Sequence, residues 1–302
     1  MKVVGFTIVR NAIKYDYPVL ESVTSLLPLC DEIIVAIGKS EDETLQLVKG
    51  ITSPKIKIIE TVWDDSLRKG GVLLAVETNK AIDAIPADAD WCVYLQADEV
   101  INENDIPAIK ESMQKWKDDK SVDGLLFNYI HFYGSYSYVG DSYRWYRKEI
   151  RVIRNDKHIR SYRDAQGFRK YKTTTPANEE LLGGGGKLNV KPANANIYHY
   201  GWVKHPSFQQ NKQQNFHKMW HDDNWVKQNV VQANEFDYSE IDSLKKFTGK
   251  HPAVMAARLK MQDWQFEYDD SKRKVSFKDR LLRFTENLTG WRPGEYKNYK
   301  LI

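Results

Sequence analysis

Residues Trp91–Val100 read WCVYLQADEV, an apolar run that ends in two adjacent carboxylates with a carboxamide shortly before them. A short apolar run bounded by polar residues predicts a buried strand of a parallel sheet. In open α/β sheets the ligand site lies at the carboxyl ends of the strands, which is where Gln96, Asp98 and Glu99 would fall. Acidic side chains there resist burial unless a positive group compensates them, and a divalent cation would do so. A solvated acidic turn that caps the next helix is the alternative.

The composition is that of an ordinary globular protein. The 302 residues are 41% hydrophobic and 28% charged, enough for one large core or two smaller ones. No apolar stretch approaches the roughly 20 residues needed to cross a bilayer, and the first residues lack the cleavage site of a signal peptide. Cys30 and Cys92 lie far apart without metal-type spacing, so we expect two buried thiols and a reducing cytoplasm.

Positive charge is concentrated in one part of the chain. Residues 144–172 hold eleven Lys or Arg against three Asp or Glu, a balance of +8, which leaves −4 for the rest because the whole chain carries +4. Such a segment indicates an anionic partner: phosphates, an acidic lipid surface or nucleic acid. A solvated charged face is the alternative. Aromatic and aliphatic residues alternate with the cations, so we expect this segment to be folded.

Strand and helix patterns alternate through the first hundred residues. Apolar or β-rich runs predict strands over Val3–Val9, Glu32–Ile37, Ile56–Glu60 and Trp91–Leu95. Helical spacing predicts helices between them: Tyr17–Leu29, a helix opening at Ser40 with Glu43 as capping box, and a helix through Leu74 and Ile85. This alternation with short connections predicts an α/β fold with a mixed, mostly parallel sheet flanked by helices.

The pattern changes in the second half. Strands are expected over Gly124–Phe132, Glu149–Arg154 and Asn194–Tyr200, and the Gly183–Gly186 run reads as a flexible loop rather than a phosphate cradle. From Pro206 onward the chain is helical and rich in aromatic residues. We therefore expect a catalytic domain over residues 1–205 and a helical C-terminal extension over residues 206–302. The amphipathic stretch 277–288 would pack on the domain, on a second subunit in a homo-oligomer, or on a membrane surface.

Three other nucleotide-using classes of protein are excluded because the chain lacks their signature motifs. A dinucleotide oxidoreductase needs a Gly-x-Gly-x-x-Gly turn there, and the chain reads Arg10-Asn11-Ala12-Ile13 instead. A P-loop enzyme needs a Gly-rich Lys-Ser/Thr element, which is absent. The Gly-rich loop of sugar-activating nucleotidyltransferases is absent as well. An α/β nucleotide-binding fold with an acidic motif near residue 98 remains.

From about Val3 to about His205 the chain resembles inverting glycosyltransferases of family 2, which share the GT-A fold. The resemblance rests on five elements in the family's order. They are Arg10-Asn11 after the first strand, Ser40-Glu41-Asp42-Glu43-Thr44 for a Ser-x-Asp-x-Thr turn, Asn79 in the helix before the metal strand, Gln96-Ala97-Asp98 for the Asp-x-Asp motif, and Tyr198-His199-Tyr200-Gly201 for a late His-Tyr-Gly.

The resemblance implies a nucleotide-diphosphate sugar donor and a divalent cation, Mn²⁺ or Mg²⁺. Asp98 and His199 would be the metal ligands, and a mixed carboxylate–imidazole set suits Mn²⁺ somewhat better. A structural histidine is the alternative for His199. The donor contacts would come from Arg10, Asn11, Ser40, Asp42, Lys69, Asn79 and Gln96, with Lys69 paired to the diphosphate unless it is a surface charge.

Two departures from the family pattern matter. Ile37 stands where many members carry an acid that contacts the base, so the sequence does not choose the donor base. Gln96 replaces the first acid of the metal motif, which leaves one fewer negative charge to hold the ion.

Inversion needs a general base for the acceptor hydroxyl, and a carboxylate is the usual choice. We expect Asp164, in the loop after the metal strand, to be that base. An ion pair of Asp164 with Arg163 or Arg169 is the alternative, and Glu149 and Glu179 are further candidates.

The sequence thus predicts a cytoplasmic, metal-dependent glycosyltransferase that moves a sugar to a glycan or lipid-linked acceptor, with a peripheral contact to the inner face of the membrane as a secondary expectation. Surface-polysaccharide assembly rests on family analogy alone. A non-catalytic nucleotide-sugar-binding protein of the same fold is the first alternative. A nucleic-acid-binding protein using residues 144–172 is the second and the less favoured.

Overall fold

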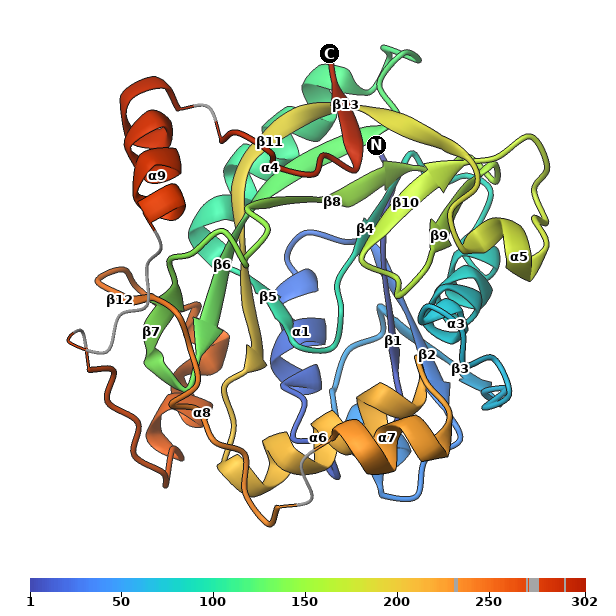
Figure 1. The fold of residues 1–302 in the computed structure, drawn as a ribbon. Helices are drawn as coiled ribbons and strands as arrows, with labels where there is room; N and C mark the ends of the chain where they lie inside the picture. The colour runs from blue at the N-terminus through green and yellow to red at the C-terminus, as the bar shows by residue number, and fades with distance from the viewer. Residues whose placement is uncertain (231–232, 270, 272–276, 291) are drawn as a thin grey trace.

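Four parallel strands form the N-terminal part of a mixed central sheet in the computed structural model, which describes residues 1–230, 233–269, 271, 277–290 and 292–302. The strands lie in the order β3-β2-β1-β4 (Figure 1), with bounds β1 Val3–Val9, β2 Glu32–Gly38, β3 Ile56–Thr61 and β4 Trp91–Tyr94. The intervening helices are α1 (Val19–Leu26), α2 (Thr44–Lys49) and α3 (Val72–Asp83). The predicted alternation is confirmed, except that the second helix begins at Thr44 and not at Ser40.

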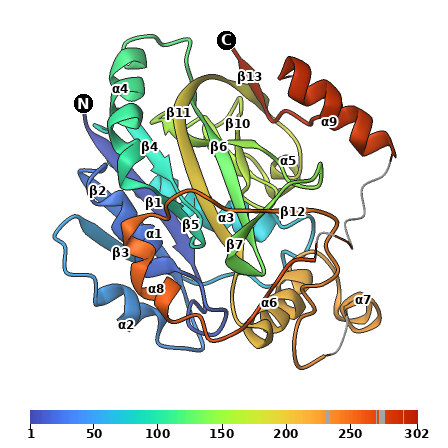
Figure 2. The same cartoon turned by 90° about the vertical axis from the view of Figure 1, so that its left-hand side faces the viewer.

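Both faces of β1, β2 and β4 are buried, as parallel strands between helices require, whereas the edge strand β3 is only partly buried. Alternate residues of each strand enter two different cores. Val3, Ile33 and Val93 pack with α1, α2 and α4 (Ile106–Trp116), whereas Val4 and Ile34 pack with α3. Figure 2 shows α1, α2 and α4 together along one side of the molecule.

The second half continues the sheet mainly with antiparallel strands, in the order β4-β8-β6-β11-β10-β9. The bounds are β5 Glu99–Ile101, β6 Gly124–Tyr133, β7 Ser135–Gly140, β8 Lys148–Arg154, β9 Ile159–Tyr162, β10 Gly167–Lys170 and β11 Gly186–Trp202, with the short helices η1 (Glu103–Asp105) and α5 (Asn178–Leu181). The short β5 pairs with β11, and this places Glu99 opposite His199. The resulting α/β architecture, a mixed sheet flanked by helices, is the one predicted from the sequence.

The segment after residue 205 is helical but also adds strands to the sheet. It contains α6 (Pro206–Lys218), α7 (Asp223–Asn229), η2 (Ala253–Met255), α8 (Ala256–Lys260) and α9 (Phe277–Thr289). β12 (Leu244–Lys246) pairs with β7, and β13 (Tyr299–Leu301) runs parallel to β11 (Figure 1). The buried Tyr299 packs into the α3-side core. Residues near 300 are thus part of the main sheet, a long-range pairing that helical periodicity does not reveal.

Three apolar residues of the amphipathic helix α9 are exposed. Leu281, Phe284 and Leu288 are 57%, 65% and 74% exposed, so they do not pack on the sheet. The side chains of Lys278, Arg280 and Arg283, which the sequence places beside them, lie outside the described residues. Among the helices that the structure describes, none is both long and apolar enough to cross a bilayer.

A fully buried ion pair joins the middle strands to the turn after β4. Arg151 of β8 donates to both carboxylate oxygens of Glu99 at 2.7 and 2.8 Å, and neither side chain is exposed. Tyr129 donates its hydroxyl to the same carboxylate at 2.7 Å. Arg151 also donates to the carbonyl of Gln166 at 2.7 Å. The pair therefore links the start of β5 to β8 and, through Gln166, to the loop before β10.

Removing one partner of this pair should strongly destabilise the protein, because the other charge stays buried without compensation. We expect Arg151→Met to lower the free energy of unfolding in urea by about 3–5 kcal/mol. The exposed pair Lys2–Asp88 provides the control, since Lys2→Met should leave the free energy of unfolding almost unchanged. Equal effects of the two substitutions would contradict the structural role given to Arg151.

Candidate functional site

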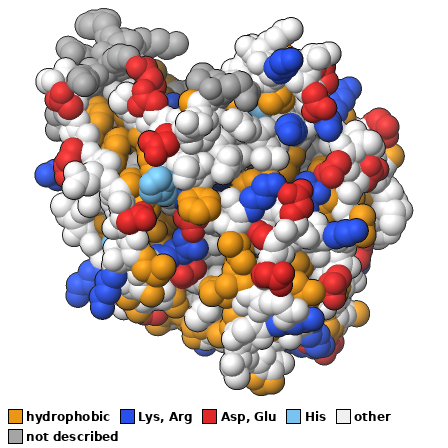
Figure 3. Space-filling view, turned by 90° about the horizontal axis from the view of Figure 1, so that it is seen from below, with side chains coloured by type: hydrophobic (Ala, Val, Ile, Leu, Met, Phe, Trp, Pro, Cys, Tyr) orange, Lys and Arg blue, Asp and Glu red, His pale blue; other side chains and the backbone are white. Residues whose placement is uncertain are grey.

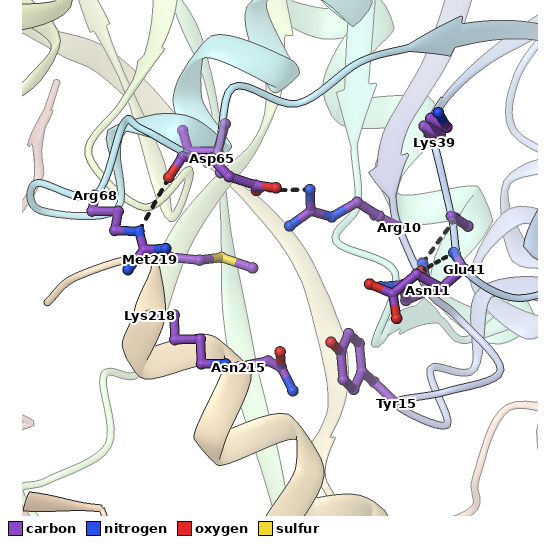
Figure 4. Close-up of a pocket in the computed structure, with 12 residues that line it drawn as sticks. Arg10, Asn11, Tyr15, Lys39, Glu41, Asp65, Arg68, Asn215, Lys218 and Met219 are labelled. Carbon is purple, nitrogen blue, oxygen red and sulfur yellow. Dashed lines mark hydrogen bonds and ion pairs between the residues drawn. The ribbon is translucent and has the colours of Figure 1, made fainter. Parts of the chain in front are cut away.

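A cavity of about 530 Å³ opens at the carboxyl ends of β1 and β4, with α6 as its opposite wall. Its wall combines aromatic side chains with a few charged ones, including Arg10, Tyr17, Trp63, Gln96, Asp98, Asp164, His199, Lys212 and Phe216. A smaller cavity of about 320 Å³ adjoins it and shares Arg10, Tyr15 and Met219 (Figure 4). On the face formed by α6 and α7, hydrophobic side chains lie among acidic and basic ones (Figure 3).

Asp98 and His199 meet at the bottom of the larger cavity. Oδ1 of Asp98 lies 3.8 Å from Nε2 of His199, and both residues are buried. The backbone holds them together, because the amide of Tyr200 donates to the carbonyl of Asp98 at 2.8 Å. The two residues that the sequence named as metal ligands, 101 positions apart in the chain, thus face one another.

The hydrogen bonds of His131 determine which nitrogen of His199 carries the proton. Nε2 of His131 lies 2.8 Å from the carbonyl of Tyr146, which can only accept. Burial lowers the pKa of His131 well below its usual value, so its ring is neutral and its Nδ1 has a lone pair. Nδ1 of His199 lies 3.0 Å from Nδ1 of His131, so it must donate a hydrogen bond to that nitrogen. The free lone pair of His199 is then on Nε2, directed toward Asp98.

A lone pair facing a carboxylate is a repulsive arrangement unless a positive group joins them. Gly201 keeps the space beside them open: a Cβ there would lie 2.6 Å from Nε2 of His199 and 2.7 Å from Oδ2 of Asp98. A carboxylate oxygen, an imidazole nitrogen oriented by a second residue, and a cradle that only glycine leaves open fit a divalent cation. Among the described residues no group of three or more His, Cys, Asp or Glu side chains could hold an ion, so further ligands would have to come from a bound molecule.

Lys212 of α6 is a residue of this site that the sequence did not reveal. Its ammonium lies 3.0 Å from Oδ2 of Asp98 and 2.9 Å from the carbonyl of Gly201. Burial raises the pKa of Asp98, but the positive charge of Lys212 outweighs that effect, so the pKa lies well below its usual value. Asp98 is therefore an anion under all ordinary conditions.

The two loops at the smaller cavity are tied to each other by predicted donor-binding residues. Asn11 adopts a left-handed conformation with φ of 58°, and its amide oxygen accepts from the backbone of Glu41 at 2.8 Å. The hydroxyl of Ser40 accepts from the backbone of Asn11 at 3.0 Å. Asp42 accepts from the backbones of Lys14 and Thr44 at 2.7 and 3.0 Å. Asn11 and Ser40 line the cavity, whereas Asp42 lines none of the cavities described here and holds the loop behind it.

Arg10, Gln96, Asn79 and Lys69 are placed differently from one another. Arg10 lines both cavities, stacks over Trp63 and pairs with Asp65 at 2.8 Å (Figure 4). Gln96 lines the larger cavity. The amide of Asn79 instead bonds the backbone of Ser161 at both its N–H and its carbonyl, so it connects α3 to β9. Lys69 is exposed and lines none of these cavities.

Asp164 lies where the larger cavity meets a third one of about 420 Å³. Its neighbours Arg163 and Ala165 have φ of 52° and 58°, a strained conformation that functional loops often retain. Burial raises the pKa of Asp164. The alternative ion pair is not formed, since the guanidinium of Arg163 donates to Leu182 and that of Arg169 to Asn298.

Glu149 is a second carboxylate in the third cavity. It accepts from the amide of Gln166 at 3.1 Å, and burial raises its pKa to about 7. A carboxylate whose pKa lies near neutrality suits proton transfer at physiological pH. Aromatic and amide side chains complete the wall, among them Tyr162, Trp220, Tyr296 and Asn298. Glu179, the remaining candidate, is exposed on α5 and lines none of the three cavities.

Most cations of the basic segment 144–172 have partners within the protein. Arg154 donates to four backbone carbonyls, and Lys157 to two. Carboxylates pair with Arg147, Arg151, Arg160 and Lys170. The excess of positive charge in this segment is therefore used largely for internal packing, which removes the argument from sequence for a nucleic-acid-binding face.

Comparison with known proteins assigns the chain to no family. No family model matches the chain, and no curated protein matches it. Among solved structures, S. aureus TarS 1-349 in complex with UDP matches with a TM-score of 0.40 and 14% identity over 78% of this chain and 68% of that chain.

Two further structures show the same level of similarity. A structure of S. aureus TarS gives a TM-score of 0.42 and 14% identity over 71% of this chain but only 39% of its own length. The chain thus spans well under half of that protein. A 4-diphosphocytidyl-2C-methyl-D-erythritol synthase from Anaerococcus prevotii gives 0.38 and 11%, over 67% of this chain and 89% of that chain. Similarities of this size leave the activity to be argued from the residues of the chain itself.

The tautomer of His199 is directly measurable. We expect ¹⁵N spectra of histidine-labelled protein to show His199 protonated at Nδ1 with a free Nε2, and His131 protonated at Nε2. His131→Phe should abolish this preference, and His199→Gln assigns the signals. An Nε2-protonated His199 in the parent protein would contradict the arrangement.

Glu149 should make stability depend on pH in a defined direction. Its folded-state pKa of about 7 exceeds the ordinary value of 4.5, so its contribution is fully present below pH 4.5 and is lost as the pH rises through 7. Glu149→Gln cannot ionise. Its free energy of unfolding relative to the parent should therefore rise between pH 5 and pH 8 by an amount on the order of 3 kcal/mol. If the free energies of unfolding of the two proteins ran parallel with pH, the pKa of Glu149 would not be raised in the folded protein.

Proposed function

We propose that this protein is a glycosyltransferase that uses a nucleotide-diphosphate sugar, with the diphosphate at Asp98 and His199. The observation that carries the proposal is the convergence of these two side chains at 3.8 Å around a space that only glycine at position 201 leaves open. A structural histidine would need neither an oriented lone pair nor that space.

The two adjoining cavities suit the two parts of such a donor. The smaller one is polar, with the loops of Asn11 and Glu41 on one side and Lys218 on the other (Figure 4). We place the nucleoside there, with Arg10 between it and the diphosphate. The sugar would lie in the larger cavity, where Trp63 and Phe216 provide apolar surface and Gln96 a polar contact.

The chemistry requires charge stabilisation on the leaving diphosphate. A divalent cation, Mn²⁺ or Mg²⁺, would supply positive charge that stabilises the diphosphate more in the transition state than in the ground state. Asp98 and His199 would hold it, and His131 fixes the ring of His199 in the orientation that this requires. α6 covers the diphosphate region and limits the access of water.

An inverting reaction places the acceptor opposite the leaving group and needs a base beside it. Asp164 lies at the junction of the donor cavity and the third cavity, so its carboxylate can take the proton of an acceptor hydroxyl. Glu149 is the second candidate for this role. A glycan or the glycan part of a lipid-linked acceptor fits a cavity lined by Tyr162, Tyr296 and amide groups, and surface-polysaccharide assembly would use such an acceptor.

A thermal-shift panel of nucleoside diphosphates, with and without Mn²⁺, tests donor binding. We expect one nucleotide to stabilise the protein and Mn²⁺ to increase that effect. Gly201→Ala should weaken the Mn²⁺-dependent binding at least about tenfold, because its Cβ occupies the space between the two ligands. Gly183→Ala is the matched control, since its Cβ would meet only a guanidinium nitrogen of Arg163 at 3.7 Å. The proposal fails if no nucleotide binds, or if Gly201→Ala binds it like the parent.

Turnover of the identified donor separates an enzyme from a binding protein of the same fold. Asp164→Asn should reduce turnover by about 10²–10⁴-fold and leave nucleotide affinity unchanged, with Glu149→Gln as the parallel variant. Parental turnover in both variants would remove both carboxylates as bases. Binding without turnover under any condition would favour the non-catalytic alternative.

A further inference from the structure

Lys212 comes from α6, outside the region that resembles a known family, and reaches the centre of the site. Its side chain is 13% exposed, and its ammonium bonds Oδ2 of Asp98 and the carbonyl of Gly201. The ring of Tyr17 lies 5.0 Å from the ammonium, a cation–π distance. Three groups from three parts of the chain thus hold one positive charge beside the proposed cation position.

The charges at this turn are already balanced by the protein. Asp98 pairs with Lys212 at 3.0 Å, and its neighbour Glu99 pairs with Arg151 at 2.7 Å. Gln96 contributes no charge. The other charged residue nearby, Lys204, is basic as well, and its ammonium bonds the carbonyls of Tyr15 and Asp16. The turn therefore offers no carboxylate with an uncompensated charge.

A divalent cation that arrives alone would gain little from such a site. It would meet one carboxylate already neutralised, one imidazole nitrogen and a nearby ammonium that repels it, since Coulomb repulsion is strong at short range away from bulk water. A diphosphate changes this balance, because it brings several negative charges and oxygen ligands of its own. The ammonium of Lys212 can then pair with the phosphate oxygens, and the carboxylate of Asp98 is free to coordinate the ion.

We propose that Lys212 is a built-in cation of the diphosphate site, and that it prevents a divalent ion from binding before the nucleotide. This inference rests on the proposed function for the identity of the ligand. Its consequence is a defined order, in which the nucleotide diphosphate enters first or together with its ion. Lys212 also remains beside the leaving diphosphate as a fixed positive charge, placed before the reaction begins.

Binding of Mn²⁺ and of inorganic pyrophosphate to the 302-residue chain tests the proposal without knowledge of the donor base. Electron paramagnetic resonance reports free Mn²⁺, and calorimetry reports pyrophosphate. In the parent we expect no saturable binding of Mn²⁺ alone, and measurable binding of pyrophosphate without metal. Lys212→Met should bind Mn²⁺ alone at least about tenfold more tightly, and pyrophosphate without metal at least about tenfold more weakly.

Two further variants keep the result interpretable. Lys212→Gln removes the charge but retains a polar side chain. It replaces Lys212→Met in both measurements if the methionine variant folds poorly, and the same changes in binding are expected. Lys227→Met removes an exposed lysine of α7 and should match the parent in both measurements.

The proposal is overturned if the parent binds Mn²⁺ alone as tightly as Lys212→Met does, or if pyrophosphate binding is unchanged in the variants. Failure of the proposed function looks different: no nucleoside diphosphate would bind the parent. The effect of Lys212 on Mn²⁺ binding is measured without nucleotide, so this measurement tests the role of Lys212 independently of the proposed function.

Discussion

The buried pair between Glu99 and Arg151 is the interaction on which the arrangement of the site depends. Glu99 follows Asp98 as the first residue of β5, and it lies opposite His199 of β11 in the sheet. Arg151 lies on β8 and also bonds the carbonyl of Gln166, two residues after Asp164. One guanidinium thus fixes both the proposed diphosphate-binding turn and the loop of the proposed base. Such a pair contributes little net stability, so its value here lies in the relative placement of the two loops.

The first hundred residues could be interpreted from sequence because their information is local. Strand–helix alternation, the apolar run before Asp98 and the polar turn at Ser40 each lie within a few residues, and period and composition suffice to locate them. The pairing of Asp98 with His199 came instead from the resemblance to a family, which assigned both residues to one metal site. The helix start at Ser40 was misplaced because the Ser40 hydroxyl bonds the backbone of Asn11, a contact that no local pattern shows.

What the sequence did not reveal is long-range. His131 and Lys212 act on the site through contacts 68 and 114 positions apart in the chain, and neither belongs to a recognisable motif. The basic segment 144–172 suggested an anionic partner for the same reason. Its count of charges says nothing about internal partners such as Asp83 or Glu286, which lie far away in sequence. Residue type gives the chemistry that is available, whereas the fold decides which groups neutralise one another.

The pairing of β13 with β11 has a consequence for how the molecule is made. Asn298 accepts from the hydroxyl of Tyr162 at 2.6 Å, and Tyr296 accepts from Arg169 at 3.0 Å, so the chain around residue 298 forms part of the wall beside Glu149. During synthesis this wall stays incomplete until the ribosome has released those residues. A nascent chain therefore contains the residues of the proposed nucleotide site before it can complete the wall of the proposed acceptor site.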